Sequence, residues 1–435
     1  MVASGRSNGG AKHAGGPPSP ALKSAVGLHS AGRLAEAETA YREILLAEPA
    51  QFDALHLLGV LQAQKGAHEE SVRLIGEALA LNAQSAPAWN NYANALRQLQ
   101  RLDEAIAAYD RAIEISPDHV EAHNNRGIVL VESGRIAEGL AGIEHALRLK
   151  PDHASAFFNR ANVVQKMGQS VDALADFDRA IALRPDYAEA YNNRGTVLRS
   201  LGRFDEALLS YARAAQLRPY DAAIVFNHAA ALHDSGRLEE ALSSYEQALT
   251  FAPHESRILR ARGNALYDLR RFTEALNSYD RANAYDPADA ENHNVRANAL
   301  KALNRYDEAL AAYDQSLALQ PANAKVHHNR GILLENIGQV VDALAACDTA
   351  VLIDPNSAEA LGQAFLLANT LCNWHDLDAR REAMQRAVRD GLPVPPYAVM
   401  TMADDPALQA QAAANYVAAY FPDRKSTRLN SSHGY

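Results

Sequence analysis

Asparagine recurs every 34 residues along much of the chain, two positions before a small residue. A carboxamide carries both hydrogen-bond donors and acceptors, so a row of them can bond the main chain of an extended peptide. Each bond contributes only ~0.5–1.5 kcal/mol net, so several must act together. The row predicts a peptide-binding surface made of Asn91, Asn125, Asn159, Asn193 and Asn227 and, after a break at Ala261 and Val295, Asn329.

The same pattern permits a second interpretation, in which the asparagines tie neighbouring helices together or persist as part of a repeat consensus. Both interpretations stay open on the sequence alone. An arginine follows the row at the next position. We expect these arginines to pack along their stems and to pair with acidic neighbours rather than form a separate anion site. They are Arg126, Arg160, Arg194, Arg262, Arg296 and Arg330.

Catalytic patterns are missing from the sequence, which has no P-loop, HExxH, GxSxG or dinucleotide-binding glycine-rich turn. His123, His293 and His327 occupy equivalent places in separate units, too far apart to converge on a metal ion. Paired acidic residues such as Asp205 and Glu206 open helices, where they favour the helix dipole and face solvent. We expect no catalytic residue, metal site or cofactor in this chain.

A 34-residue period positions these side chains. Proline ends successive units at Pro49, Pro117, Pro151, Pro185, Pro219, Pro253, Pro287, Pro321 and Pro355, and at the one gap Pro87 opens the next helix instead. A small residue keeps the same step from Ala25 and Gly59 to Gly331, and alanine does so in a second helix. An aromatic residue fills the space between the two helices, as at Tyr41, Tyr109, Phe177, Tyr211, Tyr245, Tyr279 and Tyr313, with Ile75, Ile143 and Cys347 as substitutes.

This pattern of small, small, aromatic and proline residues resembles the tetratricopeptide repeat. The resemblance implies an all-α, right-handed superhelix of about ten repeats, in which the asparagine row looks into a concave groove. We expect residues 1–20 to be a disordered lead-in, residues 21–357 to form the solenoid and residues 358–422 to form a short α-helical extension. The repeat register is expected to fail after Pro355, because Phe365 stands where a small residue belongs.

The composition narrows the classes of partner. A net charge of −10 argues against a general nucleic-acid binder, and no apolar run is long enough to cross a membrane. Two cysteines without a CxxC pair fit a reducing cytoplasm, and Cys347 at an aromatic position is expected to be a buried apolar group. Residues 423–435 resemble a translated sequencing adapter, so we expect a non-native tail and a native sequence that stops near Pro422.

The segment after the repeats predicts a helix around Asp376 to Val388, a proline-rich crossing around Gly391 to Tyr397 and a helix from Pro406 to Tyr420. Cys372, Trp374, Asp376, Asp378, Leu392, Pro393 and the stretch Asp404 to Gln409 carry a further resemblance. They are similar to the entry of the catalytic region of O-linked N-acetylglucosamine transferases, notably the bacterial SPINDLY-like branch. His375 beside Trp374 is expected to be a solvated helix-start residue, and the histidine that some members carry between Val394 and Met402 is missing.

This resemblance implies a bacterial, cytoplasmic parent enzyme that transfers a sugar from a UDP-sugar donor to Ser or Thr of proteins. The nucleotide-sugar lobes would follow Pro422, so we expect this chain to bind protein or peptide segments in the concave groove and to transfer nothing itself. The UDP-sugar is expected only for the parent. The alternative is a non-enzymatic scaffold or adaptor, and dimerisation through the solenoid is left open.

Overall fold

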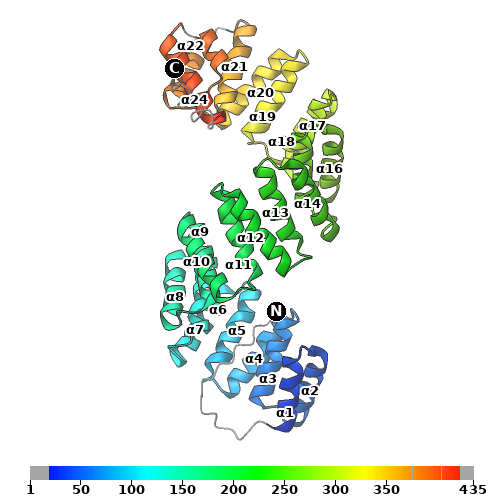
Figure 1. Ribbon diagram of the computed structural model, residues 1–435, viewed down its shortest axis with the longest axis vertical. Coiled ribbons are helices and arrows are strands. Elements are labelled where there is room, and N and C mark those ends of the chain that lie inside the picture. The colour runs from blue at the N-terminus through cyan, green and yellow to red at the C-terminus, as the bar shows by residue number, and fades with distance from the viewer. Residues whose placement is uncertain (1–18, 374–375, 403, 422–435) are drawn as a thin grey trace, which may run out of the picture. The chain divides into compact units, whose positions relative to one another are not determined.

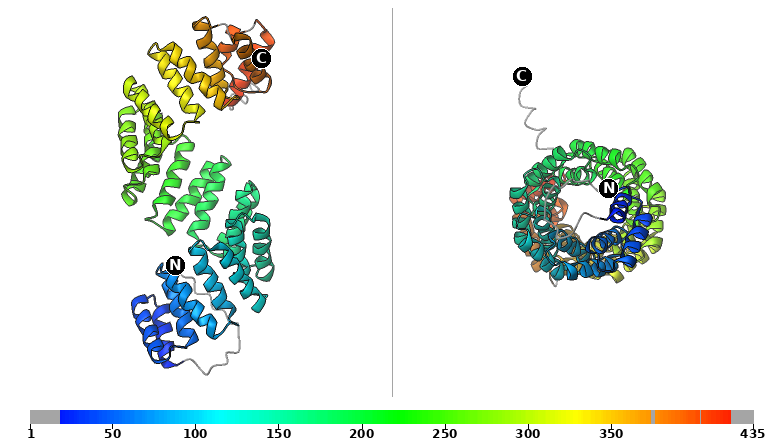
Figure 2. Two further views of the ribbon diagram at one scale, coloured as in Figure 1. Left: turned by 180° about the vertical axis from the view of Figure 1, so that it is seen from behind. Right: turned by 90° about the horizontal axis from the view of Figure 1, so that it is seen from below.

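The computed structural model describes residues 19–373, 376–402 and 404–421, and every regular element in them is an α-helix (Figure 1). The contacts divide the chain into an N-terminal unit that ends at Leu217 and a C-terminal unit that begins at Arg218. In both units, consecutive helices pair as hairpins that stack on the next hairpin, as the view from behind in Figure 2 also shows. The division falls inside the predicted solenoid.

The N-terminal unit consists of six hairpins. Their helices are α1 (Pro20–Ser30), α2 (Leu34–Ala47), α3 (Phe52–Gln64), α4 (His68–Leu81), α5 (Ala86–Gln98), α6 (Leu102–Ile115), α7 (Val120–Glu132), α8 (Ile136–Leu149), α9 (Ala154–Lys166), α10 (Ser170–Leu183), α11 (Ala188–Ser200) and α12 (Phe204–Leu217).

The C-terminal unit continues with four hairpins and then four further helices. The hairpin helices are α13 (Ala222–Asp234), α14 (Leu238–Phe251), α15 (Ser256–Asp268), α16 (Phe272–Tyr285), α17 (Ala290–Ala302), α18 (Tyr306–Leu319), α19 (Ala324–Asn336) and α20 (Val340–Ile353). The last four helices are α21 (Ala358–Thr370), α22 (Leu377–Arg389), α23 (Pro396–Met402) and α24 (Pro406–Tyr420).

Side-chain caps start many of the helices. Ser85 Oγ accepts a hydrogen bond from Ala88 N at the start of α5, and both Ala223 N and Ile224 N donate to Asp221 at the start of α13. The even-numbered helices often begin differently, with an arginine whose guanidinium binds the glutamate three residues later. These pairs are Arg101–Glu104, Arg135–Glu138, Arg203–Glu206, Arg237–Glu240, Arg271–Glu274 and Arg305–Glu308. The acidic residues that open these helices are thus surface groups, as predicted.

One residue in each turn after an odd-numbered helix has a left-handed backbone, and these residues lie 34 apart. They are Gly32, Gly66, Gln100, Gly134, Gly168, Gly202, Gly236, Arg270, Asn304, Gly338 and Cys372. Glycine adopts this backbone without the steric cost that a Cβ adds, which explains its preference there. Since Cys372 continues the series, the expectation that the register fails after Pro355 was wrong. The helix register extends through α21, although a large residue replaces the small one.

The small residues let the two helices of a hairpin approach each other. A Cβ built on Gly195 would lie 2.8 Å from the Tyr211 ring, and one on Gly263 would lie 2.4 Å from the Tyr279 ring. Both tyrosine rings are buried, as are the other aromatic residues at this register position. Cys347 is fully buried there too, and burial raises the pKa of its thiol to about 12, as expected of an apolar core group.

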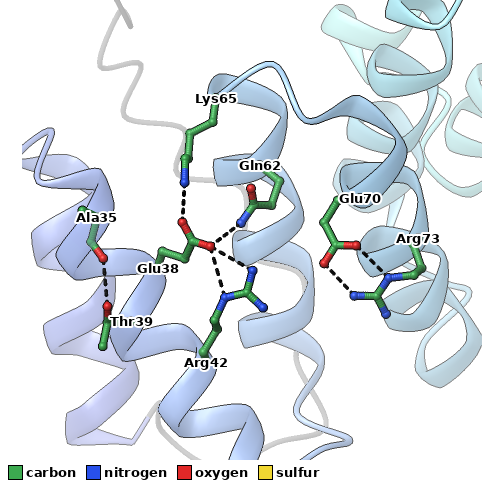
Figure 3. Close-up of polar contacts among 8 residues, drawn as sticks. All are labelled: Ala35, Glu38, Thr39, Arg42, Gln62, Lys65, Glu70 and Arg73. Atoms are coloured by element: carbon green, nitrogen blue, oxygen red, sulfur yellow. Dashed lines mark hydrogen bonds and ion pairs between the residues drawn. The ribbon is translucent and has the colours of Figure 1, made fainter.

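Polar contacts tie successive hairpins at the N-terminal end of the array (Figure 3). The Glu38 carboxylate on α2 accepts hydrogen bonds from Arg42 on the same helix and from Gln62 and Lys65, which lie at the end of α3. The Lys65 Nζ to Glu38 Oε2 distance is 2.5 Å. These donors lower the pKa of Glu38 to about 2, so its charge persists across the neutral range.

Helices α21 to α24 close the end of the C-terminal unit with a core of their own. Phe365, Met384, Val394 and Val399 are buried together in it. Arg380 on α22 pairs with Asp348 on α20, and Asn415 Nδ2 on α24 donates to the carbonyl of Val388 at 2.8 Å. The proline-rich stretch contains the short helix α23, which sequence reasoning missed, because Pro396 fits a first helical turn.

The all-α tetratricopeptide-repeat architecture predicted from the sequence is confirmed, with ten hairpins in the described part of the chain. The predicted helices at Asp376 to Val388 and Pro406 to Tyr420 are present as α22 and α24. The predicted lead-in, apart from its last two residues, and the predicted non-native tail lie outside the described residues, as do Trp374 and His375. None of the described helices is long and apolar enough to cross a membrane.

Candidate peptide-binding surface on the inner helices

The odd-numbered helices approach one another across hairpins, from α1 through α11 in the N-terminal unit and from α13 through α19 in the C-terminal unit. We call these odd-numbered helices the inner helices and their exposed side the inner surface. A stack curves toward the side on which its neighbouring elements come closest. The inner surface is therefore the concave side of each unit taken by itself.

Every asparagine of the predicted row lies on an inner helix and is half-buried there. Asn91, Asn125, Asn159 and Asn193 lie on α5, α7, α9 and α11, Asn227 lies on α13 and Asn329 lies on α19. Half-burial next to polar neighbours leaves these amides accessible from the inner surface. Their use in peptide binding stays a prediction.

Hydrogen bonds join the asparagines of one hairpin to those of the previous one. Asn125 Nδ2 donates to Asn90 Oδ1 at 3.2 Å, and Asn159 Nδ2 donates to Asn124 Oδ1 at 3.0 Å. The remaining bonds of this kind are Asn193 Nδ2 to Asn162 Oδ1 at 2.9 Å and Asn329 Nδ2 to Asn294 Oδ1 at 3.4 Å. The second interpretation of the row, as ties between neighbouring helices, is confirmed for these residues.

Asn91 forms the same kind of tie with a histidine. Its Nδ2 lies 3.0 Å from His56 Nε2, one hairpin back on α3. An amide N–H can only donate, so the ring nitrogen accepts and the imidazole is neutral. Burial lowers the pKa of His56 to about 4, against a smaller opposing effect of the Asp53 carboxylate, so the ring stays neutral at pH 7.

The ties leave part of each carboxamide available. Each has two N–H donors and an oxygen with two lone pairs. Asn193 donates one N–H to Asn162, and its oxygen accepts from Asn192 Nδ2 at 3.2 Å, which leaves one donor and one acceptor. Asn125 directs its amino group at Asn90 and Asn94 and accepts from Asn124, so it retains a single acceptor site. The ties also hold the amides in fixed orientations for any ligand.

Sequence reasoning missed the partners of the row. Asn94, Asn264 and Asn298 accept hydrogen bonds from Tyr109 Oη at 2.5 Å, Tyr279 Oη at 2.8 Å and Tyr313 Oη at 2.5 Å, respectively. These buried phenol hydroxyls thereby find partners, which explains tyrosine at a core position. The signal was present, because asparagine also recurs at 34-residue spacing one position before the row and three positions after it.

All six arginines that follow the row pair with an acidic residue sixteen positions away, as predicted. The pairs are Arg126–Asp110, Arg160–Asp176, Arg194–Asp178, Arg262–Glu246, Arg296–Asp280 and Arg330–Asp314, with closest distances of 2.5 to 2.9 Å. Five of them join an inner helix to the last helix of the preceding hairpin. They are structural ties and leave no separate anion site.

The three histidines at equivalent places fasten the turns before their helices. The Nε2–H groups of His123, His293 and His327 donate to the carbonyls of Pro117, Pro287 and Pro321 at 2.9 to 3.0 Å. The indole N–H of Trp89 at the same register position binds the Ala83 carbonyl. Within the described residues, no group of histidine, cysteine and acidic side chains could hold a metal ion.

Comparison with known proteins gives one family. Models described as TPR repeat match residues 93–134 and 297–338, and models described as tetratricopeptide repeat match residues 28–75, 159–222 and 232–299. None of the curated proteins matches the chain.

Solved structures with a related fold include three bacterial-size repeat arrays. YrrB, described as a TPR protein with an unusual peptide-binding site, is 28% identical over 43% of this chain and 97% of its own, with a TM-score of 0.36. MamA is 21% identical over 38% and 96%, with a TM-score of 0.34. A tetratricopeptide repeat protein from Parabacteroides merdae is 17% identical over 60% and 98%, with a TM-score of 0.47. The matched family models and the hairpin architecture together make this chain a tetratricopeptide-repeat protein.

Proposed function

We propose that the inner surface binds an extended segment of a partner protein through the asparagine row. The observation that carries this proposal is the arrangement at Asn159 and Asn193. Each spends one N–H on the previous hairpin and keeps a second N–H, with at least one acceptor lone pair, at a half-buried place. One amide per hairpin in a fixed orientation suits the regularly spaced N–H and C=O groups of an extended main chain.

The test replaces Asn125, Asn159 and Asn193 together by alanine. Loss of three peptide bonds of ~0.5–1.5 kcal/mol each should weaken binding about ten- to a hundredfold. The probes are peptides selected on the unmodified protein from a displayed library of random 12-residue sequences, and their affinities are measured by fluorescence anisotropy. Unchanged affinity would rule out the asparagine row as the binding surface.

A matched control carries three changes at the same one-per-hairpin spacing, away from the inner surface. Glu104, Glu138 and Glu206 are exposed at the starts of even-numbered helices, and we expect their change to glutamine to leave peptide affinity as it was. Both triple variants should keep the helical circular dichroism of the parent. The alanine variant should unfold at a slightly lower temperature, because the ties between hairpins are lost with the amides.

We further propose that the array presents protein substrates to a glycosyltransferase of the O-linked N-acetylglucosamine type. The resemblance carried by Cys372 and by the stretch from Asp404 to Gln409 supports this proposal. Attachment of α21 to α24 to the last hairpin through Arg380 and Asp348 is consistent with it, since a rigid junction would fix a bound segment relative to a following domain. UDP-sugar would then be a substrate of the parent enzyme.

The coding sequence beyond residue 422, read from genomic DNA, separates this proposal from a scaffold. An open frame that encodes a two-lobed glycosyltransferase supports the enzyme. An in-frame stop codon leaves a scaffold that binds partners through the same surface and transfers nothing.

A further inference from the structure

The inner surface of the N-terminal unit contains a pocket of about 290 Å³ between α3, α4 and α5. Val60 and Ala63 on α3 and Ile75 on α4 supply apolar walls. Asn91, a member of the asparagine row, and Asn94 border it on α5. The pocket therefore lies where a segment bound along the row would pass.

A missing tyrosine explains the pocket. In other hairpins a tyrosine at the register position of Ile75 reaches across to the inner helix, as Tyr109 Oη does to Asn94 and Tyr211 Oη to Thr196. Ile75 is shorter and carries no hydroxyl, and Val60 stands where the hydroxyl partner would be. The space that a phenol ring occupies elsewhere thus opens toward the inner surface here.

A second hairpin with isoleucine at this position is packed differently. Around Ile143, Gly127 and Gly139 allow α7 and α8 to touch, since a Cβ on Gly139 would lie 2.4 Å from the Gly127 carbonyl oxygen. In the hairpin with the pocket, Ser71 takes the place of Gly139, and Ala63 takes the place of the larger Val131. Closer helices compensate for isoleucine in one hairpin and do not in the other.

The chemistry of the walls selects the occupant. Small-molecule sites are typically 300–1,000 Å³, so a pocket at the lower limit suits one large side chain better than a whole ligand. The pocket is mostly apolar, but His68 also lines it, and His68 Nδ1 is buried without a hydrogen-bond partner among the described residues. An aromatic ring fills the apolar space, and a phenol hydroxyl can bond such a nitrogen.

We propose that this pocket receives a phenylalanine or tyrosine side chain from the partner segment and so sets the position of that segment along the array. The inference rests on the proposed function, because the aromatic side chain is carried by the segment that the asparagine row binds. The row reads the main chain alike in each hairpin, whereas the pocket is tied to one hairpin and supplies the register.

The test fills the pocket with the pair that the neighbouring hairpin uses. Val60→Asn together with Ile75→Tyr recreates the contact of Asn94 with Tyr109, so the variant should fold. Peptides of 12 residues selected from a displayed random library on the unmodified protein should carry an aromatic residue at one fixed place. The filled variant should bind them about tenfold more weakly, and Phe→Ala or Tyr→Ala in the peptide should weaken binding only to the unfilled protein.

A second variant protects the test against misfolding of the first. Ala63→Leu narrows the pocket from its wall and should also weaken binding, whereas Gln165→Leu, at the same register position on α9 where Phe177 is the core aromatic residue, should not. Equal affinity for the filled and unfilled proteins, or selected peptides without an aromatic residue, would overturn the pocket while the asparagine row stands. If the unmodified protein selects no peptide, the proposed function fails together with the pocket.

Discussion

Single residues in the turns differ in how well they fit the left-handed backbone. Seven of the described turns after inner helices use glycine, but Gln100, Arg270 and Asn304 adopt φ values of 60°, 59° and 59°. A side chain there costs on the order of 1 kcal/mol or more, although asparagine tolerates this backbone better than most residues. These turns keep the geometry because the helices on either side are held by their packing.

Arg270→Gly should therefore stabilise the protein. Relief of the backbone strain outweighs the extra freedom that glycine gains in the unfolded chain, for a net gain of about 0.5 kcal/mol. A rise in the urea midpoint of the C-terminal unit, followed by hydrogen exchange of α15 and α16, would show it. Asn304→Gly is the matched control and should give a smaller rise. An unchanged or lower midpoint for Arg270→Gly would mean that the turn is not strained.

Amide contacts between inner helices act at the scale of the element. The row position of one hairpin bonds the preceding hairpin at the position of Asn90, Asn124 or Asn294, and His56 takes that position on α3. A histidine there accepts the same bond only while it is neutral. The tie between α3 and α5 is thus the acid-sensitive member of an otherwise pH-independent set.

Acid should weaken the α3–α5 tie. The ordinary pKa of histidine is 6.5 and that of folded His56 is about 4. Between these values the unfolded chain binds a proton that the folded chain does not, so the free energy of unfolding falls by up to ~1.4 kcal/mol per pH unit as the pH drops. The stability that neutral His56 preserves is complete above pH 6.5.

His56→Asn installs the residue that neighbouring hairpins use and should remove this contribution. Thermal unfolding between pH 7 and pH 4.5, followed by hydrogen exchange at α3 and α5, should show a smaller loss than in the parent. The reverse exchange one hairpin on, Asn90→His, should add acid sensitivity. Identical pH profiles for the parent and His56→Asn would show that His56 titrates normally.

The sequence predicted the periodic part of the molecule well, because every hairpin repeats the same few packing requirements. The small residue at Gly195 and the ring of Tyr211 touch as their spacing implies, and the Arg296–Asp280 pair follows from a recurring charge pattern. The Asn125 bonds to Asn90 and Asn94 could not be assigned, since spacing shows which side chains are near and not which acceptor an amide selects. The pocket at Ile75 depends on how closely α3 and α4 pack, which no single residue reveals.

At the scale of the whole molecule, contacts are confined to neighbours along the array. Each hairpin packs on the hairpins before and after it, and α21 to α24 cover the last one with a separate core. Stability in such an array is close to a sum of local terms, so damage should stay local. A single melting temperature is then a poor description of the chain.

Phe365→Ala tests this local character. Phe365 is 1% exposed in the core of α21 to α24, and its loss should cost about 3–5 kcal/mol. Hydrogen exchange should speed up in α20 to α24 and remain unchanged in α1 to α12. Met400→Ala, on the exposed side of α23, is the control and should change neither. Faster exchange throughout the N-terminal unit would show that the array unfolds as one cooperative body.

The regular contacts also bear on how such a chain can change its length. The Arg296–Asp280 and Arg330–Asp314 pairs join successive hairpins at the same two places, and the left-handed turn residue recurs at the same interval. A stretch of gene that encodes 34 residues can therefore be duplicated or lost by recombination, and the new junction meets surfaces that already fit. The reach of the inner surface is then a heritable variable, whereas the hairpin that contains Ile75 keeps its own specificity wherever the count changes.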